Sequence, residues 1–513
     1  MVEMMEGEPK KEVVTGEFVQ IGVSRPPLPV TDLPEPEEVF HVKGRIGPKQ
    51  LVLYVLGPSM IALGISIGSG EWLVGPRTVG GAGGFVGIGW VVLVSALLQV
   101  FYNVELGRFT VATGEAPVVA FGRVPPGFIL WTPLAVGLFY LAFIWGGWAA
   151  NAGESLFPLI FGRARTAAEL PTVKALGAGL LLVVFVITLF GKKISRTLEI
   201  ANWIMVVFIL VSVAIIAIIV VPATVWGSSF ASLVIPAAPP SGTSATNLGA
   251  LAGFTALASG LNYVAISYYR DKGYGMGHRV GYIAGLVGGK QEEVRPSGMI
   301  FPEDPKNISR WKRWFKYLLI DQWAVFFVGA LFGMMLPTMI VYQLRQTSGV
   351  PVTDLNIPTY AADQLGVHFG PFLRTWALVV GFFILFSTQL GVFDLLSRQF
   401  VDGAHAISAR FRRFTQGNPR RFYYPFLLLL AGAITGFLFL LPPFRLIQVS
   451  ANFSNLPAMI MPFAVIYLNR RLPKVARLRW WSYIVLLLNV VFFGFFFINF
   501  AVNELTGKPL VTF

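Results

Sequence analysis

Eleven apolar runs, each long enough to cross a bilayer, constrain the fold of this 513-residue chain more than any other feature. A membrane-spanning helix needs about 20 predominantly apolar residues. Charged residues make up only 13% of the chain, whereas soluble domains carry about 25%. The sequence therefore predicts an all-α, multi-pass protein embedded in a lipid bilayer. The expected spans are residues 51–78, 85–107, 127–150, 173–191, 198–222, 246–269, 317–343, 371–396, 422–441, 444–468 and 480–502.

Lysine and arginine alternate between the two sides of this predicted topology. With a cytoplasmic N-terminus, 32 of the 40 basic residues lie on the cytoplasmic side, and the long connection 223–245 carries none. Basic residues favour cytoplasmic loops, so we expect a cell-membrane protein with a cytoplasmic N-terminus and an extracytoplasmic C-terminus. The net charge of +14 then reflects topology, and we expect no nucleic-acid partner.

The first span carries glycines and an acid at its midpoint, in the run Gly68-Ser69-Gly70-Glu71. Glycine weakens a helix by about 1 kcal/mol relative to alanine, and a carboxylate at bilayer depth costs about 2.5 kcal/mol or more. Lipid cannot hydrogen-bond the backbone of a broken helix, so a break must face protein or water. The run therefore predicts a discontinuous helix that builds a polar site, a device of secondary transporters. The alternative is a continuous, flexed helix whose Glu71 pairs with a neighbouring helix.

The sixth span repeats the pattern with Ser259, Gly260 and Asn262 at its middle. Interrupted spans in corresponding positions indicate a transport site between two inverted repeats, here two halves of five helices. The predicted organisation is a flexible cytoplasmic tail (1–48), a first repeat (49–225), an extracellular connection (226–245), a second repeat (246–470, including a cytoplasmic loop, 271–316), and an eleventh helix with a short external C-terminus (471–513).

Three stretches of the chain follow a familiar pattern: Gly57-Pro58 through Glu71 in span one, Leu106-Gly107-Arg108 through Glu115 from the end of span two, and Ile447-Gln448-Val449 with Asn455-Leu456-Pro457 in span ten. In these stretches the sequence resembles the Nramp family of divalent-metal transporters. The resemblance implies the LeuT-type fold: two inverted five-helix repeats plus one extra helix, helices one and six broken, and a site between them. Nramp proteins typically carry divalent metal ions inward together with protons.

The chain departs from the family at the metal site. Gly68 to Glu71 replace the family's Asp-Pro-Gly-Asn, and Ser259 to Asn262 replace Met-Pro-His-Asn, so that Gln448 alone matches a metal-contacting position. The family's proton-pathway acids fall on Gly147 and Ala150. The predicted substrate site comprises Gly68, Ser69, Gly70, Glu71, Ser259, Gly260, Asn262 and Gln448, with Glu71, Asn262 and Gln448 as metal ligands.

Oxygen donors without thioether or imidazole suit hard ions such as Mg²⁺ or Mn²⁺, and a transported divalent cation is therefore the preferred substrate, with no bound cofactor expected. A LeuT-fold carrier of an organic cation or an amino-acid-like molecule is a second hypothesis. A non-transporting membrane sensor or scaffold, docking a partner through loop 271–316, is a third. An enzyme is not expected, because no nucleophile–base pair, metal triad or nucleotide motif is present.

Two further groups have alternative interpretations. Basic and aromatic residues interleave in the run from Arg310 to Tyr317, and beside a span this pattern predicts an anchor for lipid headgroups. Asp394 and Arg398 lie one helical turn apart in the eighth span, where they could form an ion pair or line an ion path.

Overall fold

The computed structural model describes residues 28–189, 194–257, 259–281, 295, 297–418 and 420–512. Within these residues the chain is nearly all helical, and the one β-type contact is an isolated bridge between Val30 and Ile300. The first part of the predicted tail, residues 1–27, lies outside the described residues.

Helices lie at the positions of all eleven predicted spans. In the first half these are α3 (Pro58–Ser66) with α4 (Gly75–Ala82), α5 (Gly89–Thr113), α7 (Trp131–Phe143) with α8 (Gly147–Phe161), α9 (Leu170–Leu189) and α10 (Ile194–Val220). In the second half they are α12 (Ala245–Phe254) with α13 (Asn262–Ala265) and α14 (Ser267–Lys272), α16 (Pro305–Ile320) with α17 (Val328–Ser348), α19 (Pro371–Ile407), α21 (Arg420–Leu438), α22 (Pro443–Asn469) and α23 (Trp480–Thr506).

Shorter helices fill the connections. They are α1 (Pro36–Val39), α2 (Pro48–Gln50), α6 (Pro117–Ala120), α11 (Ala223–Val234), α15 (Gly277–Val280), α18 (Ile357–Phe369) and α20 (Ala409–Thr415). Within the described residues, nine helices are long and apolar enough to cross a membrane, and the pair Pro48–Val55 and Pro58–Ala82, bent by 62°, makes a tenth. The predicted sixth span corresponds to α12, α13 and α14, each of which is short.

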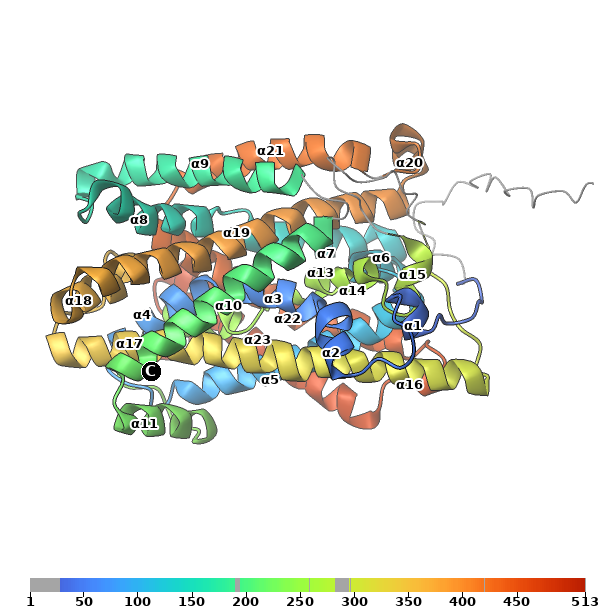
Figure 1. The fold of residues 1–513 in the computed structure, drawn as a ribbon, viewed down its shortest axis with the longest axis horizontal. Helices are drawn as coiled ribbons and strands as arrows, with labels where there is room; N and C mark the ends of the chain where they lie inside the picture. Colours follow the sequence, from blue (N-terminus) through green and yellow to red (C-terminus); the bar gives the residue numbers. More distant parts are fainter. Residues whose placement is uncertain are drawn as a thin grey trace, which may run out of the picture.

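The long helices run roughly along one axis of the molecule, as in a membrane bundle (Figure 1). The first span, α3 and α4, packs against α10, α17 and α19, whereas α12 packs against α5, α22 and α23. Figure 1 shows α9 and α21 side by side at one edge, where they contact each other. Both interrupted spans therefore lie among other helices, as an interruption of backbone hydrogen bonds requires in lipid.

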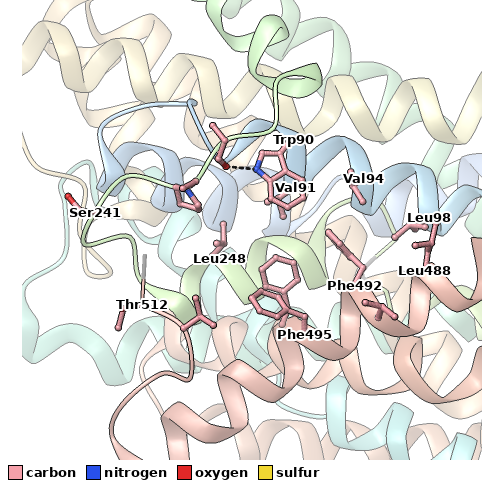
Figure 2. Close-up of a pocket in the computed structure, with 16 residues that line it drawn as sticks. Trp90, Val91, Val94, Leu98, Ser241, Leu248, Leu488, Phe492, Phe495 and Thr512 are labelled. Atoms are coloured by element: carbon pink, nitrogen blue, oxygen red, sulfur yellow. Dashed lines mark hydrogen bonds between the residues drawn. The ribbon is translucent and has the colours of Figure 1, made fainter.

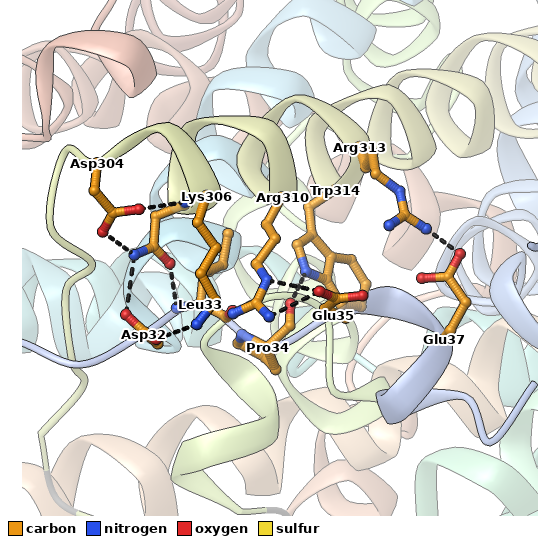
Figure 3. A network of polar contacts seen from close by, with 11 residues as sticks. Asp32, Leu33, Pro34, Glu35, Glu37, Asp304, Lys306, Arg310, Arg313 and Trp314 are labelled. Atoms are coloured by element: carbon orange, nitrogen blue, oxygen red, sulfur yellow. Dashed lines mark hydrogen bonds and ion pairs between the residues drawn. The ribbon is translucent and has the colours of Figure 1, made fainter.

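The tail was predicted to be flexible up to residue 48, but its described part is held against the bundle. Residues 32–40 lie along α16, and we refer to this arrangement as the N-terminal clasp (Figure 3). Leu33 is fully buried and its N–H donates to Asn307 Oδ1 over 2.8 Å. The indole of Trp314 donates to the carbonyl of Pro34 over 2.8 Å, and its ring meets Phe40 edge-on.

Ion pairs complete the clasp. Arg310 pairs with Glu35 over 2.8 Å, Lys306 pairs with Asp32 over 2.8 Å, and Arg313 pairs with Glu37. The prediction that this basic and aromatic run anchors lipid headgroups is therefore wrong for Arg310, Arg313 and Trp314. Headgroup phosphates and tail carboxylates are both anionic partners for arginine, and here the chain supplies the anions itself.

We predict that Trp314→Ala releases the clasp. Trp314 is fully buried, and truncation of a buried tryptophan typically costs about 3–5 kcal/mol. The expected result is faster cleavage after Glu37 and Glu38 by a glutamate-specific protease, together with a lower thermal midpoint. Lys312→Ala is the matched control, because Lys312 is exposed on the same helix. Equal cleavage of the two variants would contradict the clasp.

The clasp should also open in acid. The hydrogen bond from Lys306 lowers the pKa of Asp32 below its usual 3.8, and the hydrogen bond from Arg310 lowers the pKa of Glu35 below its usual 4.5. A carboxylate whose pKa falls on folding stabilises the folded form fully above its ordinary pKa and loses that contribution as pH falls through the lowered value. Hydrogen exchange of residues 31–37, corrected for its intrinsic pH dependence, should therefore show protection at pH 6 that decreases as the pH falls below the ordinary pKa values of 4.5 and 3.8. Protection that is unchanged at pH 3 would exclude the ion pairs as its cause.

Candidate functional site

The first span is interrupted one residue before the predicted glycine run. The helix α3 ends at Ser66, Ile67 leaves the helical conformation with ψ of 82°, and a π-helical segment, Gly70–Val74, follows. The N–H of Gly68 donates to Glu71 Oε2 over 2.8 Å. The carboxylate of Glu71 therefore satisfies a backbone group that the interruption has freed.

Two glycines of this segment allow neighbouring helices to approach. A Cβ on Gly70 would lie 2.0 Å from the carbonyl oxygen of Phe254, at the end of α12, and a Cβ on Gly68 would lie 2.1 Å from Thr388 Oγ1 on α19. The interrupted segment of span one thus touches span six on one side and span eight on the other. The glycines are needed for space at these contacts.

The second interruption is longer. The helix α12 ends at Phe254, Thr255 is extended with φ of −73° and ψ of 139°, Ala256 has φ of +62°, and the helix resumes at Asn262. A positive φ at alanine is strained and persists only where surrounding contacts hold it. The sequence pattern placed the polar cluster of span six in this region, and Ser259, Gly260 and Asn262 lie within it or at its end.

Gln99 of α5 bridges this second interruption, and the sequence analysis did not single it out. Its Nε2 donates to the carbonyl of Thr255 over 2.5 Å, and its Oε1 accepts from Leu257 N over 3.0 Å and from Asn262 Nδ2 over 3.3 Å. Asn262 Nδ2 also donates to Asn103 Oδ1 over 2.8 Å. The available signal was a pair of amides four residues apart in an apolar span, which places them on one helix face.

Ser259 and Gly260 face α22. The hydroxyl of Ser259 donates to the carbonyl of Ser454 over 3.1 Å. A Cβ on Gly260 would lie 3.0 Å from Pro457 and 3.1 Å from the ring of Phe143. Both residues therefore contribute to the packing of the interrupted segment against span ten.

Gln448, the third predicted metal ligand, lies elsewhere on α22. Its Nε2 donates to Asn247 Oδ1 over 2.6 Å, near the start of α12. Six helical residues, about 9 Å, separate Gln448 from Ser454, which contacts the interruption. Among the described residues, no hydrogen bond or ion pair joins Glu71, Asn262 and Gln448 to one another, and no group of three or more His, Cys, Asp and Glu side chains could hold a metal. In this conformation the structure does not bring the three predicted ligands together.

Glu71 differs from the other buried acids of the described residues. It is fully buried, and its Oε1 has no hydrogen-bond partner. Six of the other buried carboxylates have basic partners, namely Glu105 with Arg108, Glu115 with Arg123, Glu154 with Arg165, Asp271 and Asp394 with Arg398, and Asp402 with Arg270. Asp321 accepts hydrogen bonds from Ser59 N over 3.0 Å and from the hydroxyl of Tyr269. Near Glu71, the hydroxyls of Ser66 and Ser69 are also buried without partners in the described part of the chain.

Three stacked aromatic rings lie beside the interruption of span six. Trp148 is 5.6 Å from Phe254 and 5.9 Å from Phe143, between ring centroids, and all three rings are buried. Phe254 also contacts Gly70, the neighbour of Glu71. An apolar, π-rich wall therefore lies next to the segment that carries the unpaired carboxylate.

A buried ion network holds the second half of span six. Arg398 of α19 pairs with Asp394 over 3.1 Å and with Asp271, at the C-terminal end of α14, while Arg270 pairs with Asp402 over 3.0 Å. The ion-pair interpretation of Asp394 and Arg398 is confirmed, and the pair extends to a helix that the sequence did not connect to it. The network fixes α14 to α19.

The helix arrangement is that of the LeuT-type transporter fold, as the resemblance predicted. Two structures of the manganese transporter of Eremococcus coleocola are similar to the chain at 14% identity: a variant with a TM-score of 0.55, covering 94% of this chain and 92% of that one, and a complex with an aromatic bis-isothiourea-substituted compound with a TM-score of 0.54, covering 91% and 90%.

MhsT in complex with L-phenylalanine is similar at 15% identity, with a TM-score of 0.52 and coverage of 86% of this chain and 97% of that one. No family model and no curated protein matches the sequence. At these identities the similarity establishes the fold and leaves the substrate open.

We predict that Gly70→Ala disrupts the contact between the two interrupted spans. The added methyl group would meet the Phe254 carbonyl at 2.0 Å, and such overpacking typically costs about 1–3 kcal/mol. Gly137→Ala is the matched control, because nothing lies within 4 Å of a Cβ on that exposed helical glycine, and alanine there should stabilise by about 0.5–1 kcal/mol. Thermal unfolding in detergent measures both changes. A Gly70→Ala midpoint at or above that of the wild type would contradict the close approach.

Proposed function

We propose that the protein is a secondary transporter that moves a small cation across the cell membrane by alternating access, with Glu71 as the charged element of its central site. The observation that carries this proposal is the free oxygen of a fully buried Glu71 that has no basic partner among the described residues. A buried charge without a partner costs several kcal/mol. The charge of Glu71 is therefore balanced by a mobile ion, either a proton or a bound cation.

The two halves of span six are attached to different helices, which supports an alternating mechanism. The first half, α12, is held by α22 through Asn452 and Asn455, which donate to the carbonyls of Thr246 and Gly249 over 3.0 Å each. The second half, α14, is held by α19 through the Arg398 network. An interrupted segment between two such attachments can bend while each half keeps its partners. Rocking of one bundle against another around a fixed site is the general scheme for this architecture.

A hard divalent cation such as Mg²⁺ or Mn²⁺ is the first substrate class. The unpartnered groups near the first interruption include three oxygens, namely Glu71 Oε1 and the hydroxyls of Ser66 and Ser69, together with the indole N–H of Trp72. Oxygen donors suit hard ions, which also retain several waters. On this view the protein is a divergent relative of the Nramp family. Asn262 Oδ1 has no partner among the described residues and would be available as a ligand. Gln448 would first have to release Arg445, which donates to its Oε1 over 3.4 Å, and Asn247.

An organic cation or an amino-acid-like molecule is the second substrate class, favoured by the stacked rings of Phe143, Trp148 and Phe254. An ammonium group near aromatic faces gains about 0.5–2 kcal/mol, and Glu71 would pair with it. These rings contain no oxygen donor that could bind a hydrated metal ion. Uptake assays with both substrate classes separate the two readings.

Glu71→Gln should abolish uptake in proteoliposomes of oriented, purified protein. Glutamine retains an oxygen that can accept from Gly68 N–H but loses the negative charge, so folding is kept while cation binding is lost. Glu38→Gln is the matched control, because Glu38 is exposed on α1. The assay compares Mg²⁺ and Mn²⁺ with a panel of amino acids and organic cations, with and without a pH gradient. Unchanged uptake by Glu71→Gln would remove this residue from the mechanism.

If no substrate is taken up and none raises the thermal midpoint of the wild type, the sensor or scaffold hypothesis is favoured. A substrate that stabilises the wild type but not Glu71→Gln would identify the binding class even where transport is too slow to follow.

A further inference from the structure

A large apolar cavity lies at the side of the bundle, away from the central site. It has a volume of about 850 Å³ and lies between the first half of α5, the middle of α23, the start of α12, the segment 237–241 and the C-terminal residues 511–512 (Figure 2). This volume is within the range of about 300–1,000 Å³ that is usual for ligand pockets.

The lining excludes a charged or strongly polar occupant. Among the described residues, no charged side chain lines the cavity, and the lining carries only two hydroxyl groups, those of Ser241 and Thr512. The indole N–H of Trp90 is already donated to the carbonyl of Ala237 over 2.9 Å. Apolar cavities without polar partners do not hold water well. The occupant must therefore be recognised by apolar surface.

The cavity is continuous with the face that spanning helices present to lipid. Leu488, Val491 and Phe495 of α23 line it and are 51%, 68% and 39% exposed. Helix α23 is among the helices long and apolar enough to cross a membrane, so its exposed side chains meet acyl chains in a bilayer. Each buried methylene of such a chain contributes about 0.8 kcal/mol.

Residues of the cavity wall alternate with the residues that hold the interrupted span six. Leu98 precedes Gln99, which bridges the interruption, and Leu248 follows Asn247, which holds Gln448. Val94 precedes Ser95, whose hydroxyl donates to the carbonyl of Ala252 over 2.7 Å. An occupant of the cavity would therefore contact α5 and α12 at residues that are next in sequence to those whose hydrogen bonds hold span six.

We propose that this cavity binds an acyl chain of a membrane phospholipid, and that the bound chain supports α5 and α12 during transport. The binding site stands on the cavity alone, whereas the effect on transport rests on the proposed function. The glycerol and headgroup would lie toward Ser241 and Thr512, the polar end of the lining.

Photocrosslinking tests the binding site without any transport measurement. The full chain in phosphatidylcholine nanodiscs is supplied with trace phosphatidylcholine carrying a diazirine on one acyl chain, and labelled peptides are quantified by mass spectrometry. We expect at least fivefold more labelling of residues 90–98 and 488–496 than of residues 425–432 on α21, where Leu428 and Leu429 are 57% and 69% exposed. Equal labelling of all three segments would show bulk lipid contact only and would overturn the proposal.

Two substitutions that fill the cavity make the test specific. Val94→Trp on α5 and Leu488→Trp on α23 should each reduce the excess labelling at least fivefold, whereas the control Leu429→Trp should leave it unchanged. A photoreactive free fatty acid is the second probe, and saturation by it in preference to phosphatidylcholine would overturn the phospholipid assignment. Loss of the excess in either tryptophan variant supports the site even if the other fails to fold.

Uptake by the same variants then tests whether the bound acyl chain affects transport. If Val94→Trp slows uptake while the substrate still raises the thermal midpoint, the result supports an effect of the bound acyl chain on transport. Unchanged uptake would contradict that effect and leave only lipid binding. An absence of uptake in the wild type would contradict the proposed function and leave the crosslinking result standing.

Discussion

The hydrogen bond from Gly68 N–H to the carboxylate of Glu71 is the contact on which the central site depends. An interrupted helix in a bilayer must find partners for its freed backbone groups within the protein, because hydrocarbon offers none. In the first span the partner is an acid three residues further along, so the interruption carries its own acceptor. That acid uses one oxygen for the backbone and leaves the other without a partner. One side chain therefore stabilises the interruption and, in the function proposed above, would supply the charge for a ligand.

The second interruption is satisfied from outside, because residues 255–261 contain no acid. Gln99 uses both ends of its amide, donating to Thr255 O and accepting from Leu257 N, so α5 serves as the scaffold for the strained turn at Ala256. This division explains why an apolar span retains two amides. It also places α5 between the central site and the lipid-facing cavity, with Gln99 on one face and Leu98 on another. The acyl chain proposed for the cavity would therefore contact the same helix that holds the second interruption.

The spans could be predicted, and Glu71 could be chosen as a candidate site residue, because both inferences follow from local energetics: the length of apolar runs and the cost of a mid-membrane carboxylate. Hydrogen-bond and ion-pair partners that are distant in sequence could not be predicted. Gln99 and Asn103 show the right spacing, yet nothing in that spacing names Thr255 or Asn262 as their partners. Gln448 matched a family position but pairs with Asn247. The acidic segment of the tail and the basic face of α16 are complementary, but more than 270 residues separate Leu33 from Asn307, and anionic lipid was an equally good partner on composition alone.

The distribution of charge inside the bundle separates structure from function. Six buried carboxylates of the described residues have an arginine partner, and Asp321 has several donors, so their neutralisation is permanent and part of the fold. An arginine placed beside Glu71 would stabilise it equally well, but it would also occupy the free oxygen in every conformation. Without a resident partner, the site is neutral only when a proton or cation is present. Because closing around an unbalanced charge is costly, the closed conformation favours the loaded site. This is the condition a carrier needs if it is to close with its substrate bound and resist closing without it.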